Sequence, residues 1–235
     1  MLADLARLLL DTVAPRRCAG CDAVSHEPIC PECAGELTAM PVPRPRPVGH
    51  GVAFAGFEFE DLVRSIVHRG KYGSDQAALR AIAALTARRI GAIPGASRPP
   101  VGSPQLQINP YLAPRQRLPR PDAIVAVPLG PRRRRQRGYN QAEVVARVLA
   151  GISSLPVLDG LHRTRETTPQ SIRDERGRRR NVDGAFAWKG SSLAGARLWL
   201  VDDVLTTGFT VDAAGEALSA AGASRVDVVI VTVVP

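Results

Sequence analysis

Residues 199–210 read Trp-Leu-Val-Asp-Asp-Val-Leu-Thr-Thr-Gly-Phe-Thr, and this segment is the strongest indication of the fold in the sequence. The run Leu198–Val201 at its start is short, bulky and branched, which is typical of a buried strand. Asp202 and Asp203 follow this run, and after a small loop the apolar residues recur at helical spacing up to Gly222. The pattern therefore predicts a strand, an acidic edge, a loop rich in Thr and Gly, and a helix.

The loop Thr206–Thr210 is suited to hold a phosphate group. Backbone N–H groups at the start of a helix have no partner inside the helix and lie at the positive end of its dipole. Carboxylates beside a bound phosphate would repel it, unless they bind sugar hydroxyls or a Mg²⁺ that the phosphates share. The residues thus favour a phosphorylated ribose as ligand. The alternative is an ordinary strand–turn–helix with two solvated aspartates at the end of the strand.

All four cysteines fall in one segment, in the pattern Cys18-x₂-Cys21-x₈-Cys30-x₂-Cys33. Two CxxC pairs can supply four thiolates to one tetrahedral zinc ion. So small a segment has no core of its own, and zinc would contribute on the order of 10 kcal/mol to its folding. Two disulfides or a redox dithiol are the alternatives. With four cysteine ligands the zinc site would be structural, and we expect His26 to be a solvated loop residue.

Charge and hydropathy limit the classes of function. The 235 residues include 31 Lys and Arg against 22 Asp and Glu, and the excess is concentrated in Arg132–Arg137 and Arg163–Arg180. Such density permits nucleic-acid binding and equally suits a small polyanion such as pyrophosphate. No apolar stretch approaches the ~20 residues of a membrane span, and no cleavage site follows the amphipathic N-terminal helix. We therefore expect a cytoplasmic protein without a signal peptide.

The rest of the chain alternates strand and helix patterns, which indicates an α/β fold. The patterns predict strands at 52–59, 123–127 and 226–234, and helices at 61–69, 74–90 and from Asn140 onward. Ser74 is expected to cap the second of these helices. A Pro-rich link at 41–47 separates residues 1–45, an N-terminal helix and zinc module, from residues 46–235, the α/β domain. Residues 92–121 are rich in Pro, Gly, Ser and Gln and predict a flexible insertion.

A second strand, Ala123–Val127, leads into the basic loop 128–137 and then a helix with the capping-box pattern of Asn140 and Glu143. In open α/β sheets the loops at the carboxyl ends of parallel strands converge on one crevice. One acidic loop with a phosphate cradle and one basic loop would meet there. They suit a ligand that carries phosphates at both ends of a ribose.

The segment Asp202–Thr210 resembles the phosphoribosyl-pyrophosphate (PRPP) signature of type I phosphoribosyltransferases. This resemblance implies a core with a mainly parallel sheet flanked by helices. It implies that Asp202 and Asp203 hold the 2′ and 3′ hydroxyls of the ribose, with Mg²⁺ bound alongside PRPP. The implied 5′-phosphate loop consists of Thr206, Thr207, Gly208, Phe209 and Thr210. Phe209 stands where that family usually has a small residue, so we expect crowding on the outer side of the loop.

Further motifs extend the resemblance to the ComF/GntX family, in which a four-cysteine zinc module precedes a phosphoribosyltransferase-like core. The motifs are Val127-Pro-Leu, Arg137-Gly-Tyr-Asn-Gln141, Arg163-Thr-Arg-Glu-Thr-Thr-Pro-Gln170, Arg176, Asn181-Val, Gly184-Ala-Phe186, and Phe57-Glu-Phe-Glu followed by Ile66-Val-His-Arg-Gly-Lys71-Tyr72. The resemblance implies a pyrophosphate loop with Pro128, Leu129, Gly130 and Arg137. It also implies a mobile cover at 163–186 whose acceptor-side residues are Arg163, Arg165, Gln170, Arg176 and Asn181.

Two classes of function stay open. The first is a glycosyltransferase of the pentosyl group, which uses Mg²⁺ and moves phosphoribose from PRPP to an unknown acceptor. No catalytic residue is assigned, because Thr206 stands where hypoxanthine-type transferases have an acid. His162 could accept a proton, although a surface histidine is the simpler interpretation.

The second class is a non-catalytic or regulatory nucleic-acid-handling protein, because ComF-type members are associated with uptake of single-stranded DNA during competence. Its partners would be single-stranded DNA, competence proteins or a second copy of the chain. The high density of Arg favours this class. An aromatic content of 4% counts against it, since base stacking is a main source of affinity for single strands. The complete PRPP signature favours the first class.

Overall fold

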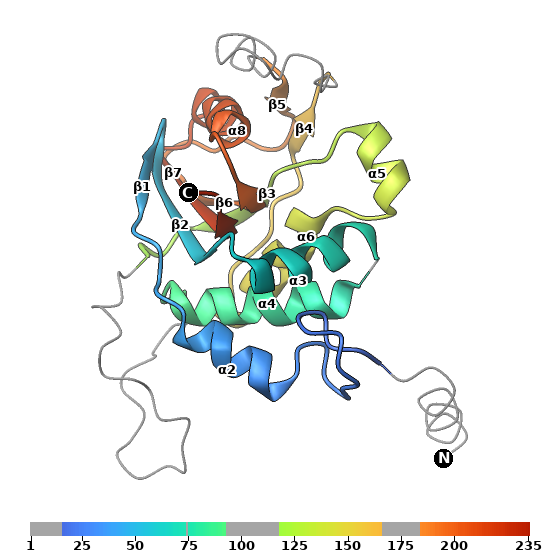
Figure 1. Cartoon of the computed structure of the whole chain (residues 1–235). Coiled ribbons are helices and arrows are strands. Elements are labelled where there is room, and N and C mark those ends of the chain that lie inside the picture. The colour runs from blue at the N-terminus through green and yellow to red at the C-terminus, as the bar shows by residue number, and fades with distance from the viewer. Residues whose placement is uncertain (1–15, 74, 93–117, 166–183) are drawn as a thin grey trace, which may run out of the picture.

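The computed structural model describes residues 16–73, 75–92, 118–165 and 184–235. Its centre is a five-stranded sheet with the strand order β1-β2-β7-β6-β3 (Figure 1). The strands are β1 (Arg46–Val48), β2 (Gly51–Glu58), β3 (Ala123–Ala126), β6 (Arg197–Leu205) and β7 (Arg225–Val233). All neighbours pair in parallel except β1, which pairs antiparallel with β2 at the edge. The predicted α/β fold with a mainly parallel sheet is confirmed.

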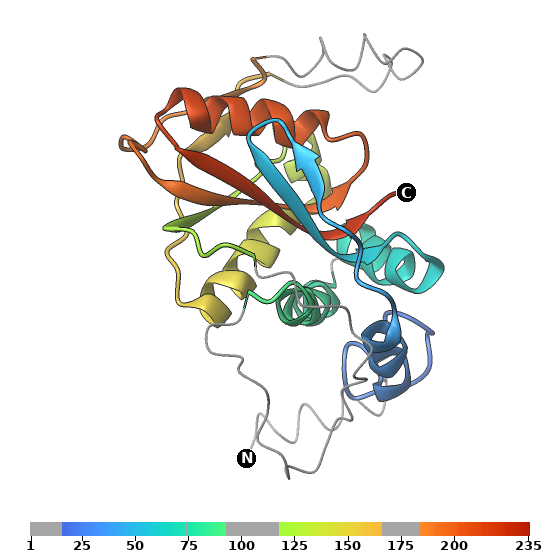
Figure 2. The same cartoon turned by 90° about the vertical axis from the view of Figure 1, so that its left-hand side faces the viewer.

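Helices cover both faces of this sheet, and Figure 2 shows α8 on the face opposite to α4 and α6. The helices are α2 (Pro31–Ala39), α3 (Asp61–Tyr72), α4 (Gln76–Arg89), α5 (Pro131–Arg137), α6 (Gln141–Ser153) and α8 (Phe209–Ala220). A separate two-stranded sheet pairs β4 (Leu161–Arg163) with β5 (Phe186–Trp188). In the described part of the chain, no helix has both the length and the apolar character that crossing a bilayer requires.

Strand β6 explains why the sheet is buried on both faces. Successive side chains of a strand point to opposite faces. Trp199 and Val201 join the hydrophobic cluster formed with α3, α4 and α6, whereas Leu198 and Leu200 join the cluster under α8. Because both faces of the strand are buried, residues 198–201 are all apolar, as is typical of strands in parallel sheets. The indole N–H of Trp199 donates to the carbonyl of Pro119 at 2.9 Å, so this buried side chain leaves no polar atom unsatisfied.

Strand β6 is longer than its apolar run predicts. Its pairing with β7 continues to Leu205 opposite Val233, so Asp202 and Asp203 lie within the strand and not after its end. Aspartate has a low propensity for strands, but the backbone hydrogen bonds to the parallel strand β7 hold both aspartates in extended conformation. The consequence is that the two adjacent carboxylates start from opposite faces of the sheet.

Three boundaries on the helices also differ from the sequence prediction. The segment 131–137, expected as a basic loop, is a short helix that begins with Pro131 after the N-cap Gly130. Helix α3 continues past Gly70 to Tyr72, because Gly70 lies inside the interface with α4, where an added Cβ would stand 3.4 Å from the Cβ of Leu79. Asp75 is the N-cap of α4, one residue after the predicted cap: its side chain accepts from the N–H of Ala78 at 3.0 Å.

Some predictions fall outside the described residues. These are the N-terminal helix at residues 1–13, Ser74, most of the insertion at 92–121, and the cover-loop residues Gln170, Arg176 and Asn181. The two described ends of the insertion pack on the domain: Ala92 and Leu118 are buried, and Arg120 donates to the carbonyl of Ser153. The domain boundary near residue 45 stays a prediction.

Candidate functional site

The two carboxylates of β6 lie in unequal surroundings. Asp203 is buried, with 8% of its surface exposed, whereas Asp202 is partly buried. The Nζ atom of Lys71, at the end of α3, lies 3.1 Å from Oδ2 of Asp203, and both side chains are largely shielded from water. This contact is an ion pair whose angles are not those of a hydrogen bond. Asp203 also donates its backbone N–H to Oδ1 of Asp202 at 2.8 Å.

Burial raises the pKa of Asp202 to about 7, and the neighbouring charge of Asp203 adds to the rise. The backbone N–H of Asp203 and the ammonium of Lys71 oppose this rise without cancelling it. Near neutral pH the pair therefore carries less than two full negative charges. A carboxyl group in this condition can accept or release a proton when a hydroxyl-bearing or cationic ligand arrives.

Of the predicted phosphate loop Thr206–Thr210, the first three residues precede α8, and Phe209 and Thr210 are the first two residues of that helix. Thr206 and Thr207 are exposed, and Gly208 is the N-cap of the helix with φ +84°, a left-handed conformation that favours glycine. No side chain caps the first turn of α8, whose N-terminal N–H groups lack intrahelical partners. Phe209 is partly buried against the cluster under α8. Its ring therefore packs against the hydrophobic core, and the expected crowding on the outer side of the loop stays a prediction.

The segment after β3 leaves the sheet beside these carboxylates. Ala126 pairs with Val201, and Val127 donates its N–H to the carbonyl of Val201 at 2.9 Å, one residue before Asp202. The chain then passes through Pro128, Leu129 and Gly130 into α5. The acidic strand and the basic segment thus meet at the carboxyl edge of the sheet, as the loop pattern predicts.

Arg137 of α5 contacts the side chains of Gln141 on α6 and Tyr72 on α3. It is partly buried, and its NH1 donates to Oε1 of Gln141 at 3.1 Å. Its guanidinium lies over the ring of Tyr72 at 5.4 Å. By contrast, Arg134 is exposed and pairs with Glu143. Glu143 therefore serves this ion pair, while Asn140 caps α6 by accepting the N–H of Ala142 at 3.1 Å.

Of the predicted cover segment 163–186, the structure describes residues 163–165 and 184–186, where the antiparallel strands β4 and β5 pair. Arg163 lies over the ring of Phe186 at 5.2 Å, and Arg165 is exposed just after β4. His162 points from β4 into solvent, where the simpler interpretation placed it. These positions bring Arg163 and Arg165 to the start of the segment that resembles the cover, and the other three residues of that set lie outside the described residues.

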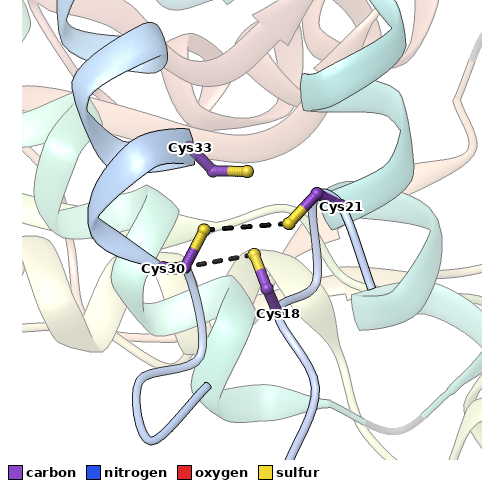
Figure 3. Close-up of side chains that lie close together, drawn as sticks. All are labelled: Cys18, Cys21, Cys30 and Cys33. Atoms are coloured by element: carbon purple, nitrogen blue, oxygen red, sulfur yellow. Dashed lines mark hydrogen bonds between the residues drawn. The ribbon is translucent and has the colours of Figure 1, made fainter. Parts of the chain in front are cut away.

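The four cysteines form one cluster at the N-terminal end of the described chain (Figure 3). Cys18 and Cys21 lie in a loop, Cys30 is the N-cap of α2, and Cys33 lies in its first turn. The four Sγ atoms all lie within 4.8 Å of one another, and those of Cys21 and Cys30 are 3.7 Å apart. Sulfurs that share a tetrahedral zinc ion lie about 3.8 Å apart, so the donor set fits this metal. His26 is exposed and is not a member of the cluster.

The backbone around the cluster favours a thiolate. Burial opposes ionisation of Cys18, but the backbone N–H groups of Cys30, Cys21 and Gly20 outweigh burial and lower its pKa to about 6. Two of these N–H groups form hydrogen bonds to the Sγ of Cys18: that of Gly20 at 3.3 Å and that of Cys30 at 3.2 Å. Burial and the neighbouring thiols raise the pKa of Cys33. Opposite shifts in one cluster are typical of thiols that share a charge.

Comparison with known proteins extends these observations. Over 112 residues the chain is 38% identical to the DNA utilization protein YhgH of Salmonella typhi, which covers 47% of this chain and 49% of that protein. Over 111 residues it is 34% identical to competence protein F of Haemophilus influenzae, which covers 46% of this chain and 48% of that protein. This chain has homologues among the competence protein F and YhgH proteins. The resemblance to the ComF family is thereby confirmed.

The chain spans about half the length of the curated relatives that it matches. No family model matches it. Among solved structures, the glutamine PRPP amidotransferase of B. subtilis complexed with ADP and GMP aligns with 66% of this chain and 26% of its own, at 19% identity and a TM-score of 0.38. An allosteric regulatory enzyme of purine biosynthesis aligns with a TM-score of 0.39 and 18% identity.

The contacts made by the last turn of α3 in this ComF homologue are not predicted by its sequence. Gly70, Lys71 and Tyr72 come from a helix that precedes the PRPP-like segment by most of the domain, yet they contact Asp203, Arg137 and Tyr139. A signal was present, because a lysine followed an apolar helical face inside one of the family-like motifs. Nothing in the spacing of that motif indicates its partner.

Proposed function

We propose that this chain binds PRPP together with Mg²⁺ at the carboxyl edge of the sheet and transfers its phosphoribose to an acceptor. The observation that supports this most is the position of Asp202 and Asp203 in β6, directly before the loop Thr206–Gly208 and the uncapped start of α8. The carboxylates would hold the ribose hydroxyls, and the loop with the first turn of α8 would hold the 5′-phosphate.

The reaction would be a displacement at the anomeric carbon of the ribose. The bond from that carbon to the pyrophosphate oxygen breaks, a bond to the acceptor nucleophile forms, and the proton of the acceptor leaves to a base that is not assigned. Positive charge develops on the ribose ring and negative charge on the leaving pyrophosphate. Arg137, fixed by Gln141 and Tyr72, would stabilise the pyrophosphate together with Mg²⁺, while the carboxylates orient the ring.

Calorimetry with Mg²⁺ and PRPP tests the binding step. We expect saturable heat with the wild-type chain and its loss, by at least about 100-fold in affinity, in the double variant Asp202→Asn plus Asp203→Asn, because each lost charged contact contributes about 1.5–3 kcal/mol. The matched control is Asp159→Asn, an exposed aspartate near β4. If the double variant binds PRPP as tightly as the wild-type chain, PRPP does not bind at these carboxylates. A separate screen for pyrophosphate release against candidate acceptors tests the transfer step.

A second candidate function is nucleic-acid handling. Its support is the row of exposed arginines on α5 (Arg132, Arg133, Arg134 and Arg135), together with relatives named for DNA utilization and competence. Binding that depends on such a row is electrostatic and steeply salt-dependent. If single-stranded DNA binds in 0.15 M salt and is preferred over duplex, this second function is favoured. Binding that disappears between 0.05 and 0.2 M salt indicates a general attraction of the basic surface for polyanions.

A further inference from the structure

The ion pair between Lys71 and Asp203 joins two segments that no motif connects. Nζ of Lys71 lies 3.1 Å from Oδ2 of Asp203, and the two side chains are 19% and 11% exposed. An ion pair removed from water to this extent must offset the desolvation of both charges, and apolar residues of similar size are often more stable in such places. A function for the charge is therefore a better explanation of this pair than stability.

The end of α3 is held in place on both sides of Lys71. On one side, the hydroxyl of Tyr139 donates to the carbonyl of Gly70, which also accepts from Nε2 of Gln141 at 3.5 Å. On the other side, the ring of Tyr72 lies under the guanidinium of Arg137. Three consecutive residues thus contact β6, the end of α5 and the start of α6. The last turn of α3 connects the carboxylate side of the candidate site with its arginine side.

The charge of Lys71 matters because the candidate site is acidic and its ligand is an anion. Two adjacent carboxylates repel each other and repel phosphates, and only a nearby cation makes their full ionisation compatible with an anionic ligand. Lys71 is the cation that the structure places against one of them. The groups that face Asp203 are Asp202 on β6, Lys71 on α3 and Tyr139 ahead of α6.

We propose that Lys71 is a positioning residue of the PRPP site, which holds the carboxylate of Asp203 oriented toward the ribose hydroxyls. This inference rests on the proposed function, since it assigns Lys71 to the same site. Lys71 acts through Asp203 and takes no part in the displacement itself. Because the contact needs a cation of the right reach and not a particular donor geometry, an arginine at this position retains part of the effect.

The test is calorimetry of Mg²⁺ and PRPP binding to Lys71→Met, Lys71→Arg and the control Arg80→Met across pH 6–9. Arg80 is an exposed residue on α4 that donates to Gln76, and its loss removes the same charge. We expect at least about a tenfold loss of affinity in Lys71→Met, a smaller loss in Lys71→Arg, and less than a twofold change in Arg80→Met. Thermal unfolding of each variant checks that it folds.

The pH profile separates positioning from mere structural support. The cation of Lys71 lowers the pKa of Asp202, which burial and the charge of Asp203 raise. Without that cation the pKa of Asp202 rises further, so the midpoint of PRPP binding by Lys71→Met is expected to move upward by about one pH unit. A purely structural role would lower affinity equally at every pH. Unchanged affinity and midpoint in a folded Lys71→Met, with normal wild-type binding, would overturn this inference alone. Absence of binding by the wild-type chain would overturn the proposed function and this inference with it.

Discussion

At the scale of single residues, Asp202 combines a role in the proposed site with a cost to the fold. Its carboxyl group is partly buried in β6, and burial followed by the charge of Asp203 raises its pKa from 3.8 to about 7. Between about pH 4 and pH 7 the folded chain therefore binds a proton that the unfolded chain does not hold. Stability falls as pH rises through this window, and the loss is complete above the folded pKa.

Replacement of Asp202 by asparagine removes this loss of stability. The amide is neutral at every pH, and its oxygen can still accept the N–H of Asp203, as Oδ1 of Asp202 does. We expect Asp202→Asn to exceed the wild-type chain in free energy of unfolding by about 1–3 kcal/mol at pH 8 and to equal it near pH 4. Urea unfolding at the two pH values measures this difference. A difference of the same size at both values would show that the ionisation of Asp202 does not cause it.

At the scale of secondary-structure elements, Arg89 at the end of α4 fixes the position of α2. Its Nε donates to the carbonyl of Gly56, and its guanidinium covers the ring of Phe57 at 4.5 Å. Its remaining donors reach carbonyls at and beyond the C-terminal end of α2, where no intrahelical partner is available: Leu37, Thr38, Met40 and Pro41. One side chain thus joins the cysteine segment to the sheet. Burial lowers the pKa of Arg89 to about 10, which still leaves it charged at neutral pH.

Arg89→Lys tests this junction, because lysine keeps the charge but lacks the planar arrangement of five donors. We expect a loss of about 2–4 kcal/mol in the free energy of unfolding, since several charge-assisted hydrogen bonds are left unmade. Arg88→Lys is the matched control. Arg88 is the exposed neighbour of Arg89 on α4, so we expect its replacement to change the free energy of unfolding by no more than about 0.5 kcal/mol. Urea denaturation compares the two variants. Equal stability of both would mean that water replaces the donors of Arg89.

At the scale of the whole molecule, the cysteine segment and the sheet share one hydrophobic cluster. Cys18, Ile29 and Leu37 belong to the same buried cluster as the apolar faces of α3, α4 and α6. The side chain of Asp22, next to Cys21, also pairs with Arg69 on α3. The cysteine segment therefore packs directly against α3, the helix whose last turn contacts Asp203. We expect the described chain to unfold as one cooperative unit.

Metal content and stability are expected to change together. We expect one zinc ion per chain by elemental analysis, and a fall in Tm of about 10 °C or more when a chelator removes it or when Cys33 is replaced in Cys33→Ser. His26→Ala is the control: this exposed histidine lies in the same loop but outside the cluster, so zinc content and Tm stay unchanged. A full loss of zinc without any change in Tm would contradict the shared core.

The features that the sequence predicted well depend on neighbours along the chain. The buried strand before Asp202, the cap at Asn140 and the four-cysteine cluster follow from alternation, capping and ligand spacing, which all act within a few residues. Predictions failed where a distant element decided. The acidic residues belong to β6 because β7 continues the ladder, and Gly70 lies inside α3 because α4 packs against it.

The sequence by itself determined the α/β order of elements, the cysteine cluster and the strand–loop–helix that carries Asp202 and Asp203. Only the tertiary structure decided that Lys71 lies against Asp203, that Tyr72 covers Arg137 and that Arg89 joins α2 to the sheet. The physical reason is the separation in sequence between the residues that make contact. Periodicity and caps arise from contacts within one or two turns, whereas these pairs form when the strand order and the packing of α3, α4 and α6 bring distant segments together. No local spacing in the chain encodes that arrangement.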